Sequence, residues 1–320
     1  MYKILIADTI AREGVEILRD AGFVVDTETE LADDEFKEKI KDYDILIVRS
    51  RTKVTKEIIE NAKKLKLIAR AGVGIDNIDI DYARNMGVAV MNSPTGVSNA
   101  VAELVIGLIL SVLRNIATAD RLLRMHKWKK PQLIGRELTG KTVGIIGFGR
   151  IGQLVVMRLR GFECKCIAFN PSVNEEKMKE LGVSKAEELD DLYKIADIIT
   201  LHVPLNEKTQ NMISRDAIQK MKDGVVIINA SRGGIVNEED LYDAIVSGKV
   251  GGAGIDTWQK EPPGDNKLLK LDTVVGTQHL GASTRDARKM ASIDIANQII
   301  AAFKENKLTN VVNDVSVLKK

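Results

Sequence analysis

Three short segments in the second half of the chain carry charged side chains just after predicted strands. Arg232 stands beside two glycines after one strand, and His279 follows another. Asp256 and Glu261 come after a third strand. The charge of a histidine changes near neutral pH, which suits it to moving a proton, and an arginine can bind a carboxylate through two parallel hydrogen bonds. Because ligands bind at the carboxyl ends of strands in open α/β sheets, we expect these residues to share one site.

Each of these side chains also has a purely structural interpretation. A single histidine is more often part of the fold than of a site, Arg232 could be a cation at a helix end, and Glu261 could be a solvated loop carboxylate. The functional interpretation is favoured because all three residues stand in ordered motifs.

A glycine-rich segment predicts a nucleotide site. Residues 143–152 read Val-Gly-Ile-Ile-Gly-Phe-Gly-Arg-Ile-Gly, with a predicted strand before Gly147 and a predicted helix after it. In this pattern the first glycine permits a tight turn, the second lets backbone amides approach a pyrophosphate, and the third lets helix and strand pack closely. The helix N-terminus adds free N–H groups and a partial positive charge. The expected cofactor contacts here are Gly147, Gly149, Arg150, Ile151 and Gly152.

The next predicted strand ends at Asn170-Pro171, where an acidic residue would usually bind the ribose hydroxyls of NAD. Asn170 is neutral, so it can hydrogen-bond a ribose but does not repel the 2′-phosphate of NADP. No arginine follows immediately to attract that phosphate. We therefore expect NAD as the cofactor, with Asn170 and Pro171 among its contacts.

The segments that must position these residues alternate between short apolar runs and amphipathic runs. Several apolar runs are nearly continuous Ile, Leu and Val, which fits strands buried on both faces of a sheet. The expected strands are 2–8, 44–49, 67–70, 88–91, 142–146, 165–169, 197–201, 225–229, 252–255, 274–276 and a small one at 310–313. The expected helices are 12–21, 56–62, 79–86, 98–126, 150–160 and 283–304. This alternation predicts the α/β class with parallel sheets.

The alternation occurs twice, which predicts two doubly wound parallel-sheet domains with a cleft between them: a Rossmann-type nucleotide domain and a flavodoxin-like substrate domain. We expect the NAD-binding domain at 99–287 and a discontinuous substrate-binding domain at 1–98 and 288–320. A single helix over 98–126 would be about 40 Å long and could cross between the domains.

Composition limits the possible functions. The 320 residues are 44% hydrophobic and 29% charged, which is a globular composition of sufficient length for two domains. The net charge is only +2 and the lysines are dispersed, so we expect no nucleic-acid partner. No apolar run is long enough for a membrane span, and the N-terminus is typical of a strand rather than a signal peptide, so we expect a cytoplasmic protein away from membranes. Cys164 and Cys166 face one side of a predicted strand, so we expect no disulfide between them. We also expect no metal site.

In their order along the chain, the motifs resemble those of the D-isomer-specific 2-hydroxyacid dehydrogenase family over essentially the whole sequence. The resemblance rests on the glycine pattern at 147–152, Arg-Gly-Gly at 232–234, Asp256 with Glu261-Pro262, and His-x-Gly-Ala-Ser at 279–283. It implies interconversion of a D-2-hydroxy acid and its 2-keto acid with NAD. One departure is Gln278, which stands where a proline commonly precedes the histidine of this family.

The resemblance also implies roles for individual residues. His279 would accept the hydroxyl proton, Glu261 would pair with His279 and orient it, and Arg232 would bind the substrate carboxylate and polarise the carbonyl. Asp256 would bind the nicotinamide carboxamide. A second subunit would be embraced by residues 98–140, which gives a homodimer. The remaining implied cofactor contacts are His202, Val203, Pro204, Thr209, Ala230, Ser231 and Gly281.

Two segments, Val48–Thr52 and Ala69–Asn77, are most similar to the family members that oxidise 3-phospho-D-glycerate to 3-phosphohydroxypyruvate on the route to serine. Arg49, Arg51 and Arg70 would then meet the substrate phosphate, and the backbone amides of Val73 and Gly74 would hold its carboxylate. The structural alternative is that Arg51 and Arg70 lie in solvent or pair with nearby acids.

Two other functions stay open. One is reduction of glyoxylate or hydroxypyruvate, and the other is a non-enzymatic, NAD-sensing corepressor. The long tails of such corepressors are not expected here, and all three catalytic residue types are present. We also expect no serine-binding regulatory domain after the last predicted helix.

Overall fold

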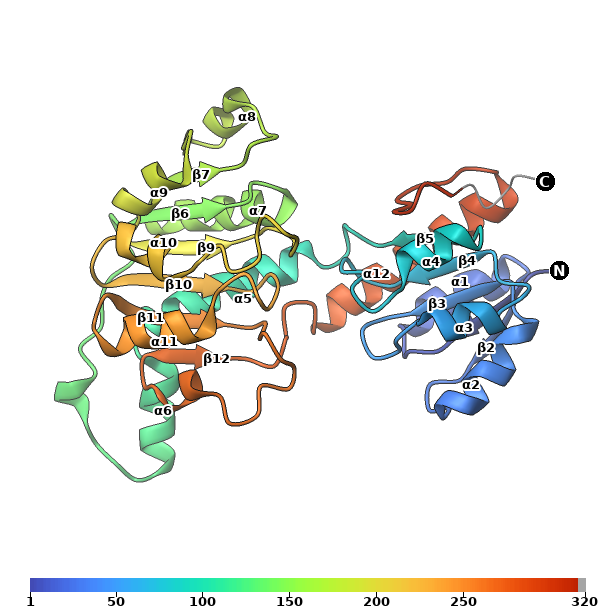
Figure 1. The fold of residues 1–320 in the computed structure, drawn as a ribbon, viewed down its shortest axis with the longest axis horizontal. Helices are drawn as coiled ribbons and strands as arrows, with labels where there is room; N and C mark the ends of the chain where they lie inside the picture. Colours follow the sequence, from blue (N-terminus) through green and yellow to red (C-terminus); the bar gives the residue numbers. More distant parts are fainter. Residues whose placement is uncertain (316–320) are drawn as a thin grey trace. The chain divides into compact units, whose positions relative to one another are not determined.

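The computed structural model describes residues 1–315, and the chain divides into two compact units. Of the described residues, the first unit contains 1–97 and 282–315, and the second contains 98–281. Each unit is built on one sheet with helices on both faces (Figure 1). Residues 316–320 of the predicted substrate domain lie outside the described residues.

The first unit has a parallel sheet in the order β2-β1-β3-β4-β5, which is the flavodoxin-like order. Its strands are β1 (Lys3–Ile6), β2 (Val24–Thr27), β3 (Ile45–Val48), β4 (Leu67–Arg70) and β5 (Ala89–Asn92). One face of the sheet is covered by α2 (Asp33–Lys39), α3 (Lys56–Asn61) and α4 (Ile80–Asn85). The other face is covered by α1 (Arg12–Asp20) and α12 (Arg285–Lys304).

The second unit has a parallel sheet in the order β12-β11-β10-β9-β6-β7-β8, which is the Rossmann order with one strand added. Its strands are β6 (Thr142–Ile146), β7 (Lys165–Phe169), β8 (Val183–Lys185), β9 (Ile198–Leu201), β10 (Val225–Asn229), β11 (Val250–Ile255) and β12 (Val274–Gly276). One face packs on α9 (Leu189–Ile195), α10 (Arg215–Lys220) and α11 (Glu238–Val246). The other packs on α5 (Ser98–Leu113), α7 (Arg150–Leu159) and α8 (Glu175–Glu180). The predicted fold class is therefore confirmed for both units.

The predicted single helix over 98–126 is wrong. It is two helices, α5 and α6 (Ile116–Arg124), which meet at 67°. The break lies at Asn115, whose φ of 54° is left-handed, a conformation that asparagine tolerates better than most residues. Among residues 1–315 no single helix has the length and apolar composition of a membrane span. Only this bent pair of helices, taken together, has that length and composition.

Short or irregular elements account for the other differences from the sequence-based expectation. The strands β2 and β8 lie at sheet edges and mix polar with apolar residues, so no continuous apolar run marks them. The small strand expected at 310–313 is a single bridge between Met91 and Val311. Four 3-10 helices complete the fold of the described residues, at Ile40–Asp42, Lys130–Gln132, Arg160–Phe162 and Lys267–Lys270.

Candidate active site

Six neighbouring strands of the second unit end at one edge of its sheet, because the strands are parallel. The segments that follow them carry the predicted catalytic and cofactor residues of this unit. They are 277–281 after β12, 256–261 after β11, 230–232 after β10, 202–204 after β9, 147–152 after β6, and 170–171 after β7. The fold therefore brings these segments to a common edge, where ligands of doubly wound sheets bind.

The glycine-rich segment has the geometry of a phosphate-binding loop. Gly147 has a φ of 96°, and a Cβ there would lie 2.4 Å from the backbone oxygen of His202. A Cβ on Gly152 would lie 2.3 Å from the oxygen of Gly147, so α7 can pack this closely only through glycine. Gly149 precedes α7 and has open space where a Cβ would project. The open backbone beside the helix N-terminus fits a pyrophosphate, with Arg150 and Ile151 in the first turn of α7.

Asn170 lies beside this loop at the end of β7. Its side-chain oxygen accepts a hydrogen bond from the backbone N–H of Phe148 at 3.4 Å, and its side-chain nitrogen donates to Ser172 at 3.1 Å. The side chain is therefore next to the predicted pyrophosphate loop. Pro171 follows and is exposed.

Replacing Asn170 with aspartate is expected to raise the ratio of kcat/KM for NAD to that for NADP by about tenfold, because a carboxylate beside the loop repels the 2′-phosphate. Steady-state kinetics with both cofactors measure this ratio. Asn174→Asp introduces the same charge four residues away at the N-terminus of α8 and is the matched control. Equal shifts in the two variants would show that Asn170 does not face the ribose.

Hydrogen bonds hold the segment after β9, which begins with a neutral histidine. The ring Nε2 of His202 lies 3.0 Å from the hydroxyl of the fully buried Thr200, and burial lowers the pKa of His202 to about 4. Thr209 donates from its hydroxyl to the backbone oxygen of Pro204 at 2.6 Å, which closes the following turn. Residues 202–204, which include the half-buried Val203, therefore carry no charge that would affect a bound nucleotide.

His279 and Glu261 form a hydrogen-bonded pair. The Nδ1 atom of His279 lies 2.9 Å from one carboxylate oxygen of Glu261 and 3.1 Å from the other. About half of the His279 side chain and two fifths of Glu261 are exposed, at 49% and 40%, so the pair is accessible to a ligand. The same Glu261 carboxylate accepts from the backbone N–H of Trp258 at 3.2 Å, which fixes its position. With Nδ1 held by a carboxylate, Nε2 is the ring atom that can exchange a proton.

The segment with Arg232 is packed against the segment with Trp258. A Cβ on Gly233 would lie 1.9 Å from the backbone oxygen of Trp258, so the two segments can approach this closely only with glycine at that position. The side chain of Asn229 donates to the backbone oxygen of Arg232 at 2.9 Å and accepts from the hydroxyl of Ser231. Arg232 itself donates to the backbone oxygen of Ser231 at 2.7 Å. The Arg-Gly-Gly motif thus places the partly buried Arg232 after β10, next to the buried Ala230.

Asp256 is fully buried and binds the segment that carries His279. One carboxylate oxygen accepts from the Thr277 hydroxyl and the Leu280 N–H, both at 2.6 Å, and the other accepts from the Gly281 N–H at 2.9 Å. The backbone oxygen of Asp256 accepts from the His279 N–H. His279 has a φ of 54°, an uncommon conformation for histidine, and these contacts surround it. The predicted contact of Asp256 with nicotinamide stays a prediction.

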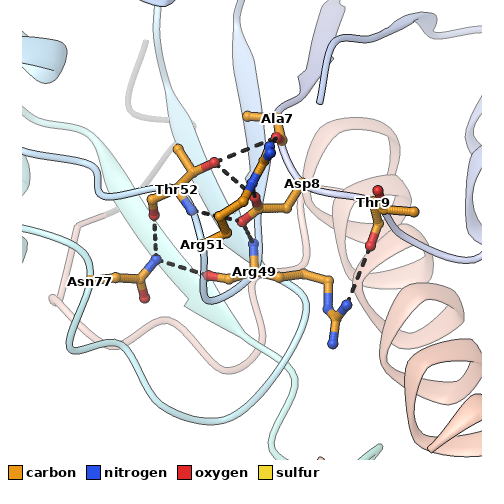
Figure 2. A network of polar contacts seen from close by, with 7 residues as sticks. All are labelled: Ala7, Asp8, Thr9, Arg49, Arg51, Thr52 and Asn77. Carbon is orange, nitrogen blue, oxygen red and sulfur yellow. Dashed lines mark hydrogen bonds and ion pairs between the residues drawn. The ribbon is translucent and has the colours of Figure 1, made fainter. Parts of the chain in front are cut away.

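Two of the three predicted phosphate contacts, Arg49 and Arg51, lie after β3, beside Asp8 at the end of β1 (Figure 2). Arg51 donates to the Asp8 carboxylate at 3.1 Å and to the backbone oxygen of Ala7 at 2.8 Å. Arg49 points away from Arg51 and makes one long side-chain bond, of 3.4 Å, to the backbone oxygen of Thr9. Arg51 therefore pairs with a nearby acid, which was the structural alternative to its predicted contact with phosphate. The Arg49 side chain, in contrast, projects from the strand end.

The predicted carboxylate-binding amides lie after β4. Asn92 donates to the backbone oxygen of Val73 at 2.6 Å, which fixes that turn. Within residues 1–315, the backbone N–H groups of Val73 and Gly74 have no protein acceptor. The guanidinium of Arg70 lies directly over Gly72, where a Cβ would be 2.0 Å from one of its nitrogens. Two available amides next to a cation suit an anionic group.

Several residues that shape these segments were not predicted. Asp8 organises the ends of β1 and β3, Thr277 binds Asp256, and Arg288 on α12 faces Arg49. Asp8 ends a predicted strand, and that position was the one available signal. The other two contacts join distant parts of the sequence.

The cysteines and acidic groups indicate no further chemistry. Cys164 and Cys166 are both free, as predicted, and burial raises the pKa of each thiol to about 11. Thiols of this kind are poor nucleophiles at neutral pH. Within the described residues no group of three or more His, Cys, Asp and Glu side chains is arranged to hold a metal ion.

Comparison with known proteins identifies the family. The family profile "D-isomer specific 2-hydroxyacid dehydrogenase, NAD binding domain" matches residues 106–281, which contain the glycine-rich loop and the pair His279–Glu261. The chain belongs to this family. The predicted family and its cofactor, NAD, are therefore confirmed.

Similar proteins carry the names of three different activities. A D-3-phosphoglycerate dehydrogenase from Methanocaldococcus jannaschii is 45% identical over 98% of this chain and 60% of its own length. A hydroxypyruvate reductase from Thermotoga maritima is 46% identical over 95% of this chain and 98% of its own length. A crystal structure of a glyoxylate reductase from Paecilomyes thermophila has a TM-score of 0.87 and 29% identity, covering 97% of this chain and 98% of that one. The chain thus spans about 60% of the length of the phosphoglycerate dehydrogenases that it matches at 43% and 45% identity.

Proposed function

We propose that this chain oxidises a D-2-hydroxy acid to its 2-keto acid with NAD. The observation that carries the proposal is the His279–Glu261 pair, at 2.9 Å, on the sheet edge that also bears the phosphate-binding loop. Such a pair is the arrangement of an acid–base catalyst whose orientation is fixed by a carboxylate. NAD, when bound, would supply the acceptor for the hydride that leaves C2 of the substrate.

The chain's own residues handle the proton and the charges. His279 accepts the hydroxyl proton at Nε2, and Glu261 stabilises the imidazolium that results. Arg232 binds the substrate carboxylate. Residues 147–152 hold the pyrophosphate, Asn170 and Pro171 meet the ribose, and the segments at 202–204 and 230–231 line the nucleotide.

We further propose 3-phospho-D-glycerate as the substrate, which gives 3-phosphohydroxypyruvate, a step toward serine. Arg49 supports this choice because its guanidinium projects from the end of β3 with one long protein hydrogen bond. The 45% identical phosphoglycerate dehydrogenase also supports it. The 46% identical hydroxypyruvate reductase favours a second candidate, reduction of hydroxypyruvate or glyoxylate.

Substrate assays separate the two candidates. With NAD, kcat/KM for 3-phosphoglycerate is expected to exceed that for glycerate or lactate at least about tenfold, since a phosphate–arginine contact is charge-assisted. With NADH, kcat/KM for 3-phosphohydroxypyruvate should likewise exceed kcat/KM for hydroxypyruvate and for glyoxylate. Equal kcat/KM values for substrates with and without the phosphate would favour the second candidate, reduction of hydroxypyruvate or glyoxylate.

We also propose that two copies associate through α6 and the segment after it. In the described chain α6 has no buried residue, and it extends away from the sheet of its unit (Figure 1). Apolar side chains are exposed on and after it: Ile116, Leu123, Met125, Trp128 and Ile134. A surface of this kind is typical of an interface. Analytical ultracentrifugation is expected to show twice the mass of the chain, and a monomer at micromolar concentration would contradict the proposal.

A further inference from the structure

A small pocket at the carboxyl ends of β1 and β3 contains more positive than negative charge. It has a volume of about 290 Å³, and Arg49, Arg51 and Arg288 line it together with Asp8 and Glu30. All these residues belong to the first unit. Three guanidinium groups therefore face two carboxylates, and the ligand that the pocket favours depends on which charges are already compensated.

The Asp8–Arg51 pair is compensated internally. Asp8 is 3% exposed and accepts hydrogen bonds from Arg51 at 3.1 Å, from the backbone N–H groups of Arg49 and Thr52, and from the Thr52 hydroxyl. Burial alone would raise the pKa of Asp8, but these hydrogen bonds lower it below its ordinary value. The carboxylate of Asp8 therefore stays ionised, and it is committed to the strand-end loops rather than to a second arginine.

Arg49 and Arg288 are not compensated in this way. Arg49 has its single bond of 3.4 Å to Thr9, and Figure 2 shows its guanidinium directed away from Asp8. Burial, followed by the nearby charge of Arg288, lowers the pKa of Arg49, and the charge of Asp8 offsets this only in part. Within residues 1–315, neither arginine forms an ion pair with Glu30, which is exposed at the pocket rim. Two like charges thus lie close together, and among residues 1–315 neither arginine forms an ion pair with a carboxylate.

The position of Arg288 makes its positive charge still less favourable. It lies in the first turn of α12, where the partial positive charge of the helix end disfavours a cation. Like charges held together at such a position destabilise the unit unless an anion binds between them. A phosphate has the charge and the oxygen atoms to accept hydrogen bonds from both planar guanidinium groups.

We propose that Arg49 and Arg288 together bind a phosphate group in this pocket, while the Asp8–Arg51 pair fixes the loops that carry Arg49. This inference rests on the proposed function in one respect: the phosphate is that of the substrate. Arg288 is then a residue that distinguishes phosphorylated from unphosphorylated substrates.

The test compares two variants of the same helix turn. Arg288→Gln removes the charge that lines the pocket, and Arg285→Gln removes an exposed charge that does not line it. Arg288→Gln is expected to raise KM for 3-phosphoglycerate about tenfold or more, with a much smaller change for hydroxypyruvate, and Arg285→Gln to change neither. Equal KM values for 3-phosphoglycerate in the two variants would overturn the proposal.

Calorimetry with inorganic phosphate tests the pocket directly and identifies the source of the ligand. Binding to the wild-type chain that Arg288→Gln weakens tenfold, and that competes with 3-phosphoglycerate, supports the substrate phosphate as the ligand. Binding without competition would overturn that identity in favour of a separate free anion. Absence of binding to the wild-type chain would overturn the pocket itself. If the wild-type chain does not oxidise 3-phosphoglycerate, the proposed function fails. Calorimetry still shows in that case whether the pocket binds phosphate.

Discussion

Replacing His279 with alanine is expected to lower turnover by about 10²- to 10⁴-fold, the contribution typical of a positioned acid–base group. Its Nδ1 atom is held 2.9 Å from the Glu261 carboxylate, so its Nε2 atom is directed to the proton that the reaction moves. The loss should fall on kcat, since the imidazole acts on the hydroxyl proton and not on the cofactor. Steady-state rates in both directions measure it.

Two controls make this result specific. Binding of NAD, followed by titration, should change less than about twofold, because the phosphate-binding loop at 147–152 lies after a different strand. Gln278→Ala alters the neighbour of His279 in the same segment and should keep most of the activity. Added imidazole should restore part of the His279→Ala rate. An active His279→Ala variant would remove the histidine from the mechanism.

The architecture was predictable because parallel βαβ units leave strong local signals. Buried strands such as β3 and β10 are continuous apolar runs, and their carboxyl ends necessarily lie at one edge. Motifs after successive strands could therefore be grouped into one site from the order of the residues alone. The resemblance to a family added the roles that strand patterns do not specify, such as the pairing of Glu261 with His279.

The features that were not predicted, a helix break and two contacts between distant residues, leave no signal in the local sequence. The break at Asn115 requires one left-handed residue, which costs too little to need a glycine or proline as a signal. Arg51 was expected at the substrate, but its neighbour across the sheet, Asp8, provides a buried carboxylate that binds it. Arg288 approaches Arg49 only because α12 returns from the end of the chain to cover the first sheet.

The segment that carries His279 should also be sensitive to the loss of its buried partner, Asp256. Asp256→Asn replaces one acceptor oxygen with an N–H donor, which must then face the N–H of Leu280 or Gly281 or the Thr277 hydroxyl. A buried donor left unsatisfied costs about 1–3 kcal/mol. We expect the melting temperature to fall by about 2–4 °C for each kcal/mol lost. We also expect kcat to fall about 10- to 100-fold, since misplacing a catalytic group slightly is costly.

A loss of stability alone could lower activity, so the decisive variants are at Thr277. Thr277→Val is nearly isosteric and deletes the hydroxyl that donates to Asp256 at 2.6 Å, whereas Thr277→Ser retains it. Thr277→Val should lower kcat about tenfold with KM for NAD little changed, and Thr277→Ser should restore most of the wild-type rate. Both rates are measured well below the melting temperature of each variant, so that unfolding does not contribute. If valine and serine behave alike at unchanged kcat, the hydrogen bond to Asp256 holds the fold together without positioning His279.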